Sequence, residues 1–121
     1  MGKYNIMFVD DDALLLRSMK RMIEDEYDVT LATGVANAMF EMGRKRPDMI
    51  FLDYEMPQLD GKKAIELIKS QVECRDIPVV FLTAKREKEV LESVSSYDPA
   101  GFLLKPPVKE QILELIVKTL G

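Results

Sequence analysis

Five short apolar runs divide the chain, and each is followed by a segment whose apolar residues recur at helical spacing. The runs predict strands at residues 5–10, 28–32, 48–53, 78–82 and 100–104. They are almost continuous rather than alternating, which is typical of parallel strands covered on both faces. Strands that alternate with helices in this way predict an α/β fold, in which a single doubly wound sheet of five parallel strands is flanked by five helices.

The segments between the runs carry apolar stripes, which we interpret as helix faces turned toward the core. The stripe positions are Leu15, Met19, Met22, Ile23, Val35, Ala38, Met39, Met42, Ile65, Ile68, Val72, Val90, Leu91, Val94, Val108, Ile112, Leu115, Ile116 and Thr119. No internal repeat or linker interrupts the pattern, so residues 1–121 are predicted to form one domain.

Polar residues stand at four of the predicted strand ends. The first strand ends in residues 10–12, which are all aspartates, and the third ends in Asp53. The fourth is followed by Thr83 and the fifth by Lys105. Ligands of a doubly wound sheet bind beyond the carboxyl ends of its strands, so we expect these four groups to meet at one site.

Each group also has an ordinary structural interpretation. Asp12 directly precedes a helical segment and is predicted to be its N-cap. Thr83 alone would be a capping residue, and Lys105 alone a solvated lysine. The other aspartates at the two strand ends are harder to explain in this way, because neighbouring carboxylates repel one another unless a cation lies between them. The combination therefore indicates a cation-dependent site.

Composition narrows the chemistry further. The chain has no histidine and a single cysteine, Cys74, which excludes histidine-assisted nucleophiles, histidine metal sites and an intramolecular disulfide. The formal net charge of -4 argues against direct nucleic-acid binding, which needs clustered Lys and Arg. No apolar run is long enough for a membrane span and no signal peptide is evident. We therefore expect a cytoplasmic protein without membrane contact.

These motifs resemble the receiver domain of response regulators, the chemotaxis-regulator-like family of two-component signalling. The resemblance covers essentially the whole chain and is carried by residues 8–12, 53–57 with 60–61, 82–84 and 102–106. It implies a flavodoxin-like (βα)5 fold and a phosphorelay function, in which an aspartate accepts a phosphoryl group from a partner's phosphohistidine. It implies no enzyme activity beyond the domain's own phosphorylation and dephosphorylation.

The resemblance also implies a magnesium site. Asp53 would be the phosphoacceptor, and Asp10, Asp11 and Asp53 would hold Mg²⁺ together with the backbone carbonyl of Glu55. This assignment agrees with the chemistry of Mg²⁺, a hard cation that prefers carboxylate, carbonyl and water oxygens. Phosphoryl transfer needs in-line positioning and charge stabilisation, which such a cation supplies.

Further roles follow from the same resemblance. Thr83 and Lys105 would bind the phosphoryl oxygens, and the Lys105–Pro106 peptide bond would be cis. Thr83 and Phe102 would form the switch, in which the hydroxyl moves toward the phosphoryl group and the aromatic ring turns inward. Phe102 has no hydroxyl, so packing alone would set its balance between two positions.

Two charged residues flank the predicted site. Glu55 follows Asp53 by two positions, and Lys85 follows Thr83 by two. The resemblance to receiver domains implies that these positions tune the dephosphorylation rate. Their opposite charges suggest an ion pair that hinders the hydrolytic water, and two unpaired surface charges are the alternative.

The implied partners are a sensor histidine kinase or phosphotransfer protein and a downstream effector or an output domain missing from this chain. A homodimer formed on phosphorylation is a further expectation. The fourth helix, fifth strand and fifth helix would form the surface that the effector recognises. Its candidate residues are Lys85, Arg86, Lys88, Glu89, Ser93, Tyr97, Pro107 and Lys109.

Two other functions stay open at this point. A haloacid-dehalogenase-type phosphatase also uses an aspartate nucleophile and Mg²⁺, but it expects a second aspartate where this chain has Glu55. A degenerate receiver that acts only as a docking module would not need the full set of acidic, threonine and lysine residues found here. The chain is compatible both with a stand-alone regulator and with part of a longer protein.

Overall fold

The computed structural model of the protein describes residues 2–56, 59–84 and 87–121. Its main sheet contains five parallel strands in the order β2-β1-β3-β6-β7. The strands are β1 (Asn5–Val9), β2 (Asp28–Ala32), β3 (Met49–Asp53), β6 (Val79–Thr83) and β7 (Gly101–Leu104). The predicted parallel sheet is confirmed, and each predicted strand boundary lies within one residue of the observed one. Strand order reverses between β1 and β3, which is where ligands of such sheets bind.

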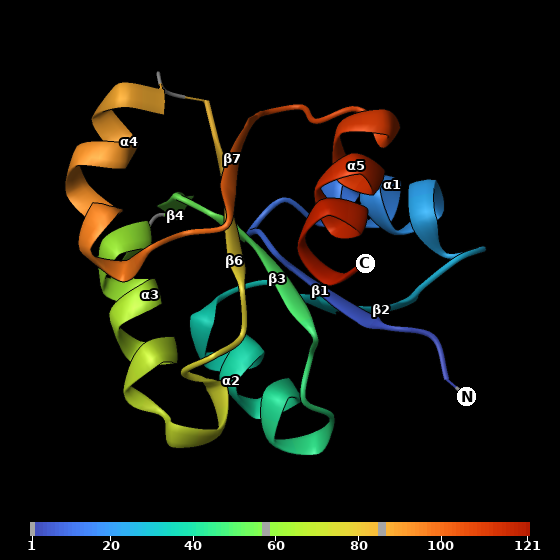
Figure 1. Ribbon diagram of the computed structural model, residues 1–121, viewed down its shortest axis with the longest axis horizontal. Coiled ribbons are helices and arrows are strands. Elements are labelled where there is room, and N and C mark those ends of the chain that lie inside the picture. The colour runs from blue at the N-terminus through green and yellow to red at the C-terminus, as the bar shows by residue number, and fades with distance from the viewer. Residues whose placement is uncertain (1, 57–58, 85–86) are drawn as a thin grey trace.

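Five α-helices cover the two faces of this sheet within the described part of the chain (Figure 1). They are α1 (Ala13–Ile23), α2 (Val35–Arg44), α3 (Gly61–Ser70), α4 (Glu87–Val94) and α5 (Lys109–Leu120). Short elements complete the fold, namely the antiparallel pair β4 (Glu55–Met56) and β5 (Leu59–Asp60) and the 3-10 helices η1 (Val72–Cys74) and η2 (Ser95–Tyr97). Figure 1 shows α1 and α5 on one side of the sheet and α3 and α4 on the other. The α/β fold with a doubly wound sheet is therefore confirmed.

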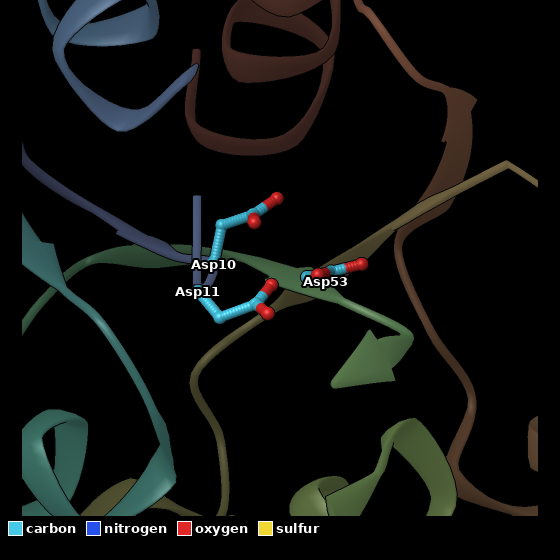
Figure 2. A group of neighbouring side chains, drawn as sticks. All are labelled: Asp10, Asp11 and Asp53. Atoms are coloured by element: carbon cyan, nitrogen blue, oxygen red, sulfur yellow. The ribbon is translucent and has the colours of Figure 1, made fainter. Parts of the chain in front are cut away.

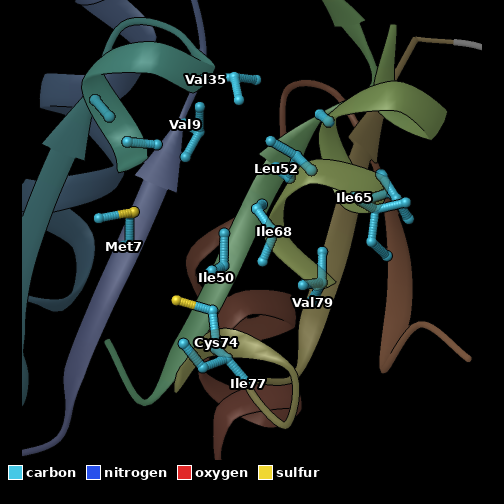
Figure 3. Packing of buried hydrophobic residues seen from close by; sticks show 14 of the residues in the cluster. Met7, Val9, Val35, Ile50, Leu52, Ile65, Ile68, Cys74, Ile77 and Val79 are labelled. Atoms are coloured by element: carbon cyan, nitrogen blue, oxygen red, sulfur yellow. The ribbon is translucent and has the colours of Figure 1, made fainter. Parts of the chain in front are cut away.

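The strands carry almost continuous apolar sequence because both of their faces are buried. One cluster packs α2, α3 and α4 against the sheet, and a second packs α1 and α5 against the opposite face. Figure 3 shows part of the first cluster, in which Ile50 and Leu52 of β3 lie beside Ile65 and Ile68 of α3. The two cores hold the central strands rigidly, and this fixes the positions of the residues at their carboxyl ends.

Three of the predicted core positions are wrong. The side chains of Val72, Leu91 and Val108 are 72%, 43% and 51% exposed. Val72 lies in η1 because α3 ends earlier, and Val108 precedes the first turn of α5. On α4, Val90 and Val94 form the buried face, which leaves Leu91 partly exposed. Conversely, Leu16 of α1 is buried although the predicted stripe omitted it.

The start of α1 agrees with the predicted N-cap. The Asp12 side chain accepts hydrogen bonds from the backbone N–H groups of Leu14 and Leu15, which have no partner inside the helix. Asp12 is thus part of the helix start, whereas the aspartates before it face the carboxyl edge of the sheet. Among the described helices, none has the length and apolar character to cross a membrane.

Candidate functional site

Three carboxylates meet at the carboxyl edge of the central strands. Asp10 and Asp11 follow β1, and Asp53 is the last residue of neighbouring β3 (Figure 2). One carboxylate oxygen from each residue lies within 4.8 Å of the others. Asp10 and Asp53 are fully buried, whereas Asp11 is exposed at the mouth of the group. Such a group offers a hard divalent cation one oxygen from each of three side chains.

Lys105 places one positive charge beside the two buried carboxylates. Its Nζ lies 3.3 Å from Asp10 Oδ2 and 3.1 Å from Asp53 Oδ1. Burial alone would lower the pKa of this lysine, but its contacts with the two aspartates raise it, so the side chain stays charged. The peptide bond between Lys105 and Pro106 is cis, as the sequence resemblance implied.

One lysine does not compensate two buried carboxylates. Burial, together with the neighbouring Asp10 charge, raises the pKa of Asp53 from its ordinary 3.8 to about 7, although Lys105 acts in the opposite direction. Asp53 Oδ1 accepts hydrogen bonds from Lys105 and from the backbone N–H of Glu55. Asp53 Oδ2 is buried and has no hydrogen-bond partner among the described residues. This acceptor oxygen is directed into a site that still favours additional positive charge.

Thr83 and Glu55 interact directly across the edge of the sheet. Thr83 is the buried last residue of β6, and its hydroxyl donates a hydrogen bond to Glu55 Oε2 at 2.5 Å. The backbone N–H of Ala84 donates to Glu55 Oε1 at 2.8 Å. Both carboxylate oxygens of Glu55 are therefore engaged by groups at the end of β6. No feature of the sequence predicted this contact.

A series of aromatic contacts runs from β7 through β6 to Tyr54, which bonds to α4. Phe102, on edge strand β7, is half-buried and stacks on Phe81 with a centroid distance of 6.0 Å. Phe81 in turn meets the edge of Tyr54 at 5.8 Å. The Tyr54 hydroxyl lies 2.6 Å from Ser93 Oγ on α4. Because the single Ser93 hydroxyl hydrogen is donated to Val90, Tyr54 is the donor in this pair.

Sequence reasoning missed Tyr54, which follows Asp53 directly. Its position after a strand-terminal aspartate was the available signal, but the partner on α4 is 39 residues away in the sequence.

A hollow of about 210 Å³ lies beside Thr83 and Phe102. Its lining residues are Thr83, Phe102, Leu103, Leu104 and Gln111.

The residues predicted for the partner surface have different environments. Lys88, Glu89 and Lys109 are exposed, and Ser93 and Tyr97 are half-buried. Pro107 is buried, so its predicted place on the surface is wrong; it lies between β7 and α5, where the chain turns into the core-facing helix. Lys85 and Arg86 lie outside the described residues, and so does the predicted Glu55–Lys85 ion pair.

The family model described as the response regulator receiver domain matches residues 6–117. The chain belongs to this family. Receiver domains are signalling modules of two-component systems, and their acidic pocket binds Mg²⁺. Members of the family act with histidine kinases and output effectors.

Known relatives agree with this assignment. The receiver domain is 34% identical to the response regulator MprA of Mycobacterium leprae, over 92% of this chain and 48% of MprA. It is 29% identical to the transcriptional regulatory protein MctR of Rhizobium johnstonii, over 98% of this chain and 56% of MctR. The chain thus spans about half the length of these curated relatives.

A solved structure supports the fold independently. The chemotaxis protein CheY4 of Vibrio cholerae covers 98% of this chain and 100% of its own, with a TM-score of 0.92 at 22% identity. At this identity the similarity concerns the fold alone, which is the flavodoxin-like arrangement predicted from the sequence.

Proposed function

We propose that residues 1–121 form one receiver domain in which Asp53 accepts a phosphoryl group from the phosphohistidine of a sensor histidine kinase or phosphotransfer protein. The single observation that carries this proposal is the buried carboxylate of Asp53. One of its oxygens is held by Lys105, and the other is unpartnered among the described residues, beside two further aspartates. A simple structural carboxylate would have both oxygens satisfied.

The transfer is a displacement at phosphorus. A lone pair of the ionised Asp53 carboxylate attacks, the bond between phosphorus and the imidazole nitrogen breaks, and the electron pair leaves with the imidazole. The product is an acyl phosphate. Lys105, which already contacts Asp53, would neutralise charge on the transferred group, and the Thr83 hydroxyl would bind one of its oxygens. The chain catalyses only its own phosphorylation and dephosphorylation in this scheme.

The acidic group suits Mg²⁺. Asp10, Asp11 and Asp53 would hold the ion together with the backbone carbonyl of Glu55, because their side-chain oxygens converge and one of them is a buried acceptor without a described partner. Burial and the neighbouring Asp10 charge raise the pKa of Asp53, so they disfavour the ionised form that must act as the nucleophile. The bound cation would supply positive charge that favours the ionised nucleophile and stabilises the phosphoryl oxygens.

Thr83 and Phe102 would carry the signal away from the site. A phosphoryl group on Asp53 attracts the Thr83 hydroxyl, and movement of Thr83 changes the wall of the hollow that it shares with Phe102. Phe102 is half-buried and lines this hollow, so its ring has space to repack. The surface of α4, β7 and α5 would then change its affinity for an effector or an output domain.

Glu55 and Lys85 would tune the lifetime of the phosphoryl group.

Phosphorylation is also expected to favour a homodimer. The free Cys74 is compatible with a reducing compartment, so we expect a cytoplasmic location.

Acetyl phosphate, a small phosphodonor, tests this function without a cognate kinase. The intact mass of the protein should increase by one phosphoryl group in the presence of Mg²⁺, and EDTA should abolish the increase. Asp53→Asn should not be modified, whereas Asp25→Asn, which changes an exposed aspartate after α1, should be modified normally. An unmodified wild-type protein, under conditions that modify a known receiver, would contradict the proposal and favour a docking module.

A further inference from the structure

Two donors at the end of β6 are already engaged before any phosphoryl group arrives. The Thr83 hydroxyl and the Ala84 backbone N–H point to the two carboxylate oxygens of one side chain, Glu55, at 2.5 and 2.8 Å. Each donor group has one hydrogen, so neither can bind Glu55 and a second anion fully at the same time. Glu55 and any anion bound at the end of β6 therefore compete.

The carboxylate of Glu55 imitates the ligand expected on Asp53. A carboxylate and a phosphoryl group both present oxygens with negative charge to hydrogen-bond donors, and bonds of this kind are stronger than neutral ones. Glu55 also lies next to the phosphoacceptor, because its own backbone N–H donates to Asp53 Oδ1 at 3.2 Å. The side chain reaches Thr83 from the immediate neighbourhood of Asp53.

We propose that the Glu55 side chain is an internal competitor of the phosphoryl group, which holds Thr83 and Ala84 in the unmodified protein and must leave when Asp53 is phosphorylated. This inference rests on the proposed function of Asp53. It assigns Glu55 a gating role through its two hydrogen bonds, distinct from the metal-ligand role of its backbone carbonyl. The half-buried side chain can turn into solvent once it is displaced.

The gate has two consequences. In the unmodified state it keeps the hydrogen of the Thr83 hydroxyl on Glu55, so this donor is not available to a ligand on Asp53. In the modified state the displaced carboxylate lies near a phosphoryl group of the same charge sign. Both effects weaken binding of a phosphoryl group, and both disappear when Glu55 is removed.

Substitutions at position 55 separate the hydrogen-bond gate from simple charge repulsion. Glu55→Ala removes charge and contact, and Glu55→Asp keeps the charge but is one methylene too short for the contact. Glu55→Gln keeps the length and one acceptor oxygen without the charge. Glu24→Ala, at an exposed position after α1 near the opposite edge of the sheet, is the matched control for net charge.

The experiment follows the Ala84 amide by NMR and titrates each protein with beryllium fluoride in Mg²⁺, as a stable mimic of the phosphoryl group. We expect the Ala84 amide proton to move upfield in the Glu55→Ala and Glu55→Asp variants, because it loses a charged acceptor. We expect Glu55→Ala to bind beryllium fluoride about tenfold more tightly than wild type, since the competing bonds and the charge are gone. Glu55→Asp should also bind more tightly than wild type, but less tightly than Glu55→Ala, because its negative charge remains. Glu55→Gln should be intermediate, and Glu24→Ala should match wild type.

The outcomes that overturn the gate are distinct from failure of the proposed function. If Glu55→Asp binds like wild type while the Ala and Gln variants bind more tightly, charge repulsion replaces the gate. If the Ala84 amide is unchanged in every variant, the contact itself is refuted. If no protein binds beryllium fluoride, wild type included, the phosphoacceptor function of Asp53 fails, and the gate fails with it.

Discussion

Replacing Asp53 by asparagine is expected to stabilise the metal-free protein, even though it removes the proposed nucleophile. Asp53 is fully buried, and burial with the Asp10 charge raises its pKa from 3.8 to about 7. Below about pH 4 the carboxyl is protonated in folded and unfolded chains alike. As pH rises toward 7 the unfolded chain releases this proton while the folded chain retains it, so stability falls. Above pH 7 the folded protein bears the full loss of stability that ionisation of Asp53 causes.

The size of this effect follows from the shift. Each pH unit between 3.8 and about 7 contributes ~1.4 kcal/mol, which gives about 4 kcal/mol at pH 8. This cost already includes the favourable contact with Lys105, which lowers the pKa of Asp53. We therefore expect Asp53→Asn to be more stable than wild type by about 4 kcal/mol at pH 8. Near pH 4 the gain should be absent.

Urea unfolding followed by circular dichroism, in the presence of a chelator, measures both stabilities across this pH range. Asp25→Asn controls for the loss of one exposed negative charge. Added Mg²⁺ should narrow the difference at pH 8, because it stabilises the ionised form of Asp53. A difference that is the same at about pH 4 and pH 8, or a variant less stable than wild type at pH 8, would refute the reasoning.

Three further predictions concern the surroundings of the site, and urea unfolding checks each of them. Tyr54→Phe and Ser93→Ala should each cost about 1 kcal/mol, and the double variant should cost less than their sum, because both lose the same hydrogen bond. Asp12→Ala should cost about 1 kcal/mol through loss of the α1 cap, and an unchanged midpoint would contradict the cap assignment. Gly61→Ala should cost about 1–3 kcal/mol, because a Cβ there would overlap the Tyr54 ring and lie 3.0 Å from its Cα. Full stability of this variant would show that the loop can shift freely.

The sheet could be predicted well from the sequence because its strands are buried on both faces. Strands such as β3, covered on both faces, need continuous apolar sequence, and the first polar residue after the run marks the strand end. Parallel strands then bring Asp10, Asp53, Thr83 and Lys105 to one edge without any knowledge of side-chain contacts. Their meeting at one site was predictable for this reason.

The details that sequence missed depend on tertiary geometry. The contact between Glu55 and the end of β6 requires the path of the short β4 strand, and the bond between Tyr54 and α4 requires the packing of two distant segments. Val72 continues the 3.6-residue stripe of α3, but the helix ends at Ser70 and the valine is exposed. The raised pKa of Asp53 likewise depends on burial and on a neighbouring charge.

The chemical identity of the phosphorylated residue tests the central claim most directly. Borohydride reduces an acyl phosphate of aspartate to the corresponding alcohol, homoserine, and leaves phosphate esters of serine or threonine intact. After phosphorylation with acetyl phosphate and Mg²⁺ and reduction, peptide mass mapping should therefore find homoserine at position 53. Unreduced Asp53 in a protein that gained a phosphoryl group, or a reduced aspartate at another position, would contradict the assignment of Asp53 as the phosphoacceptor.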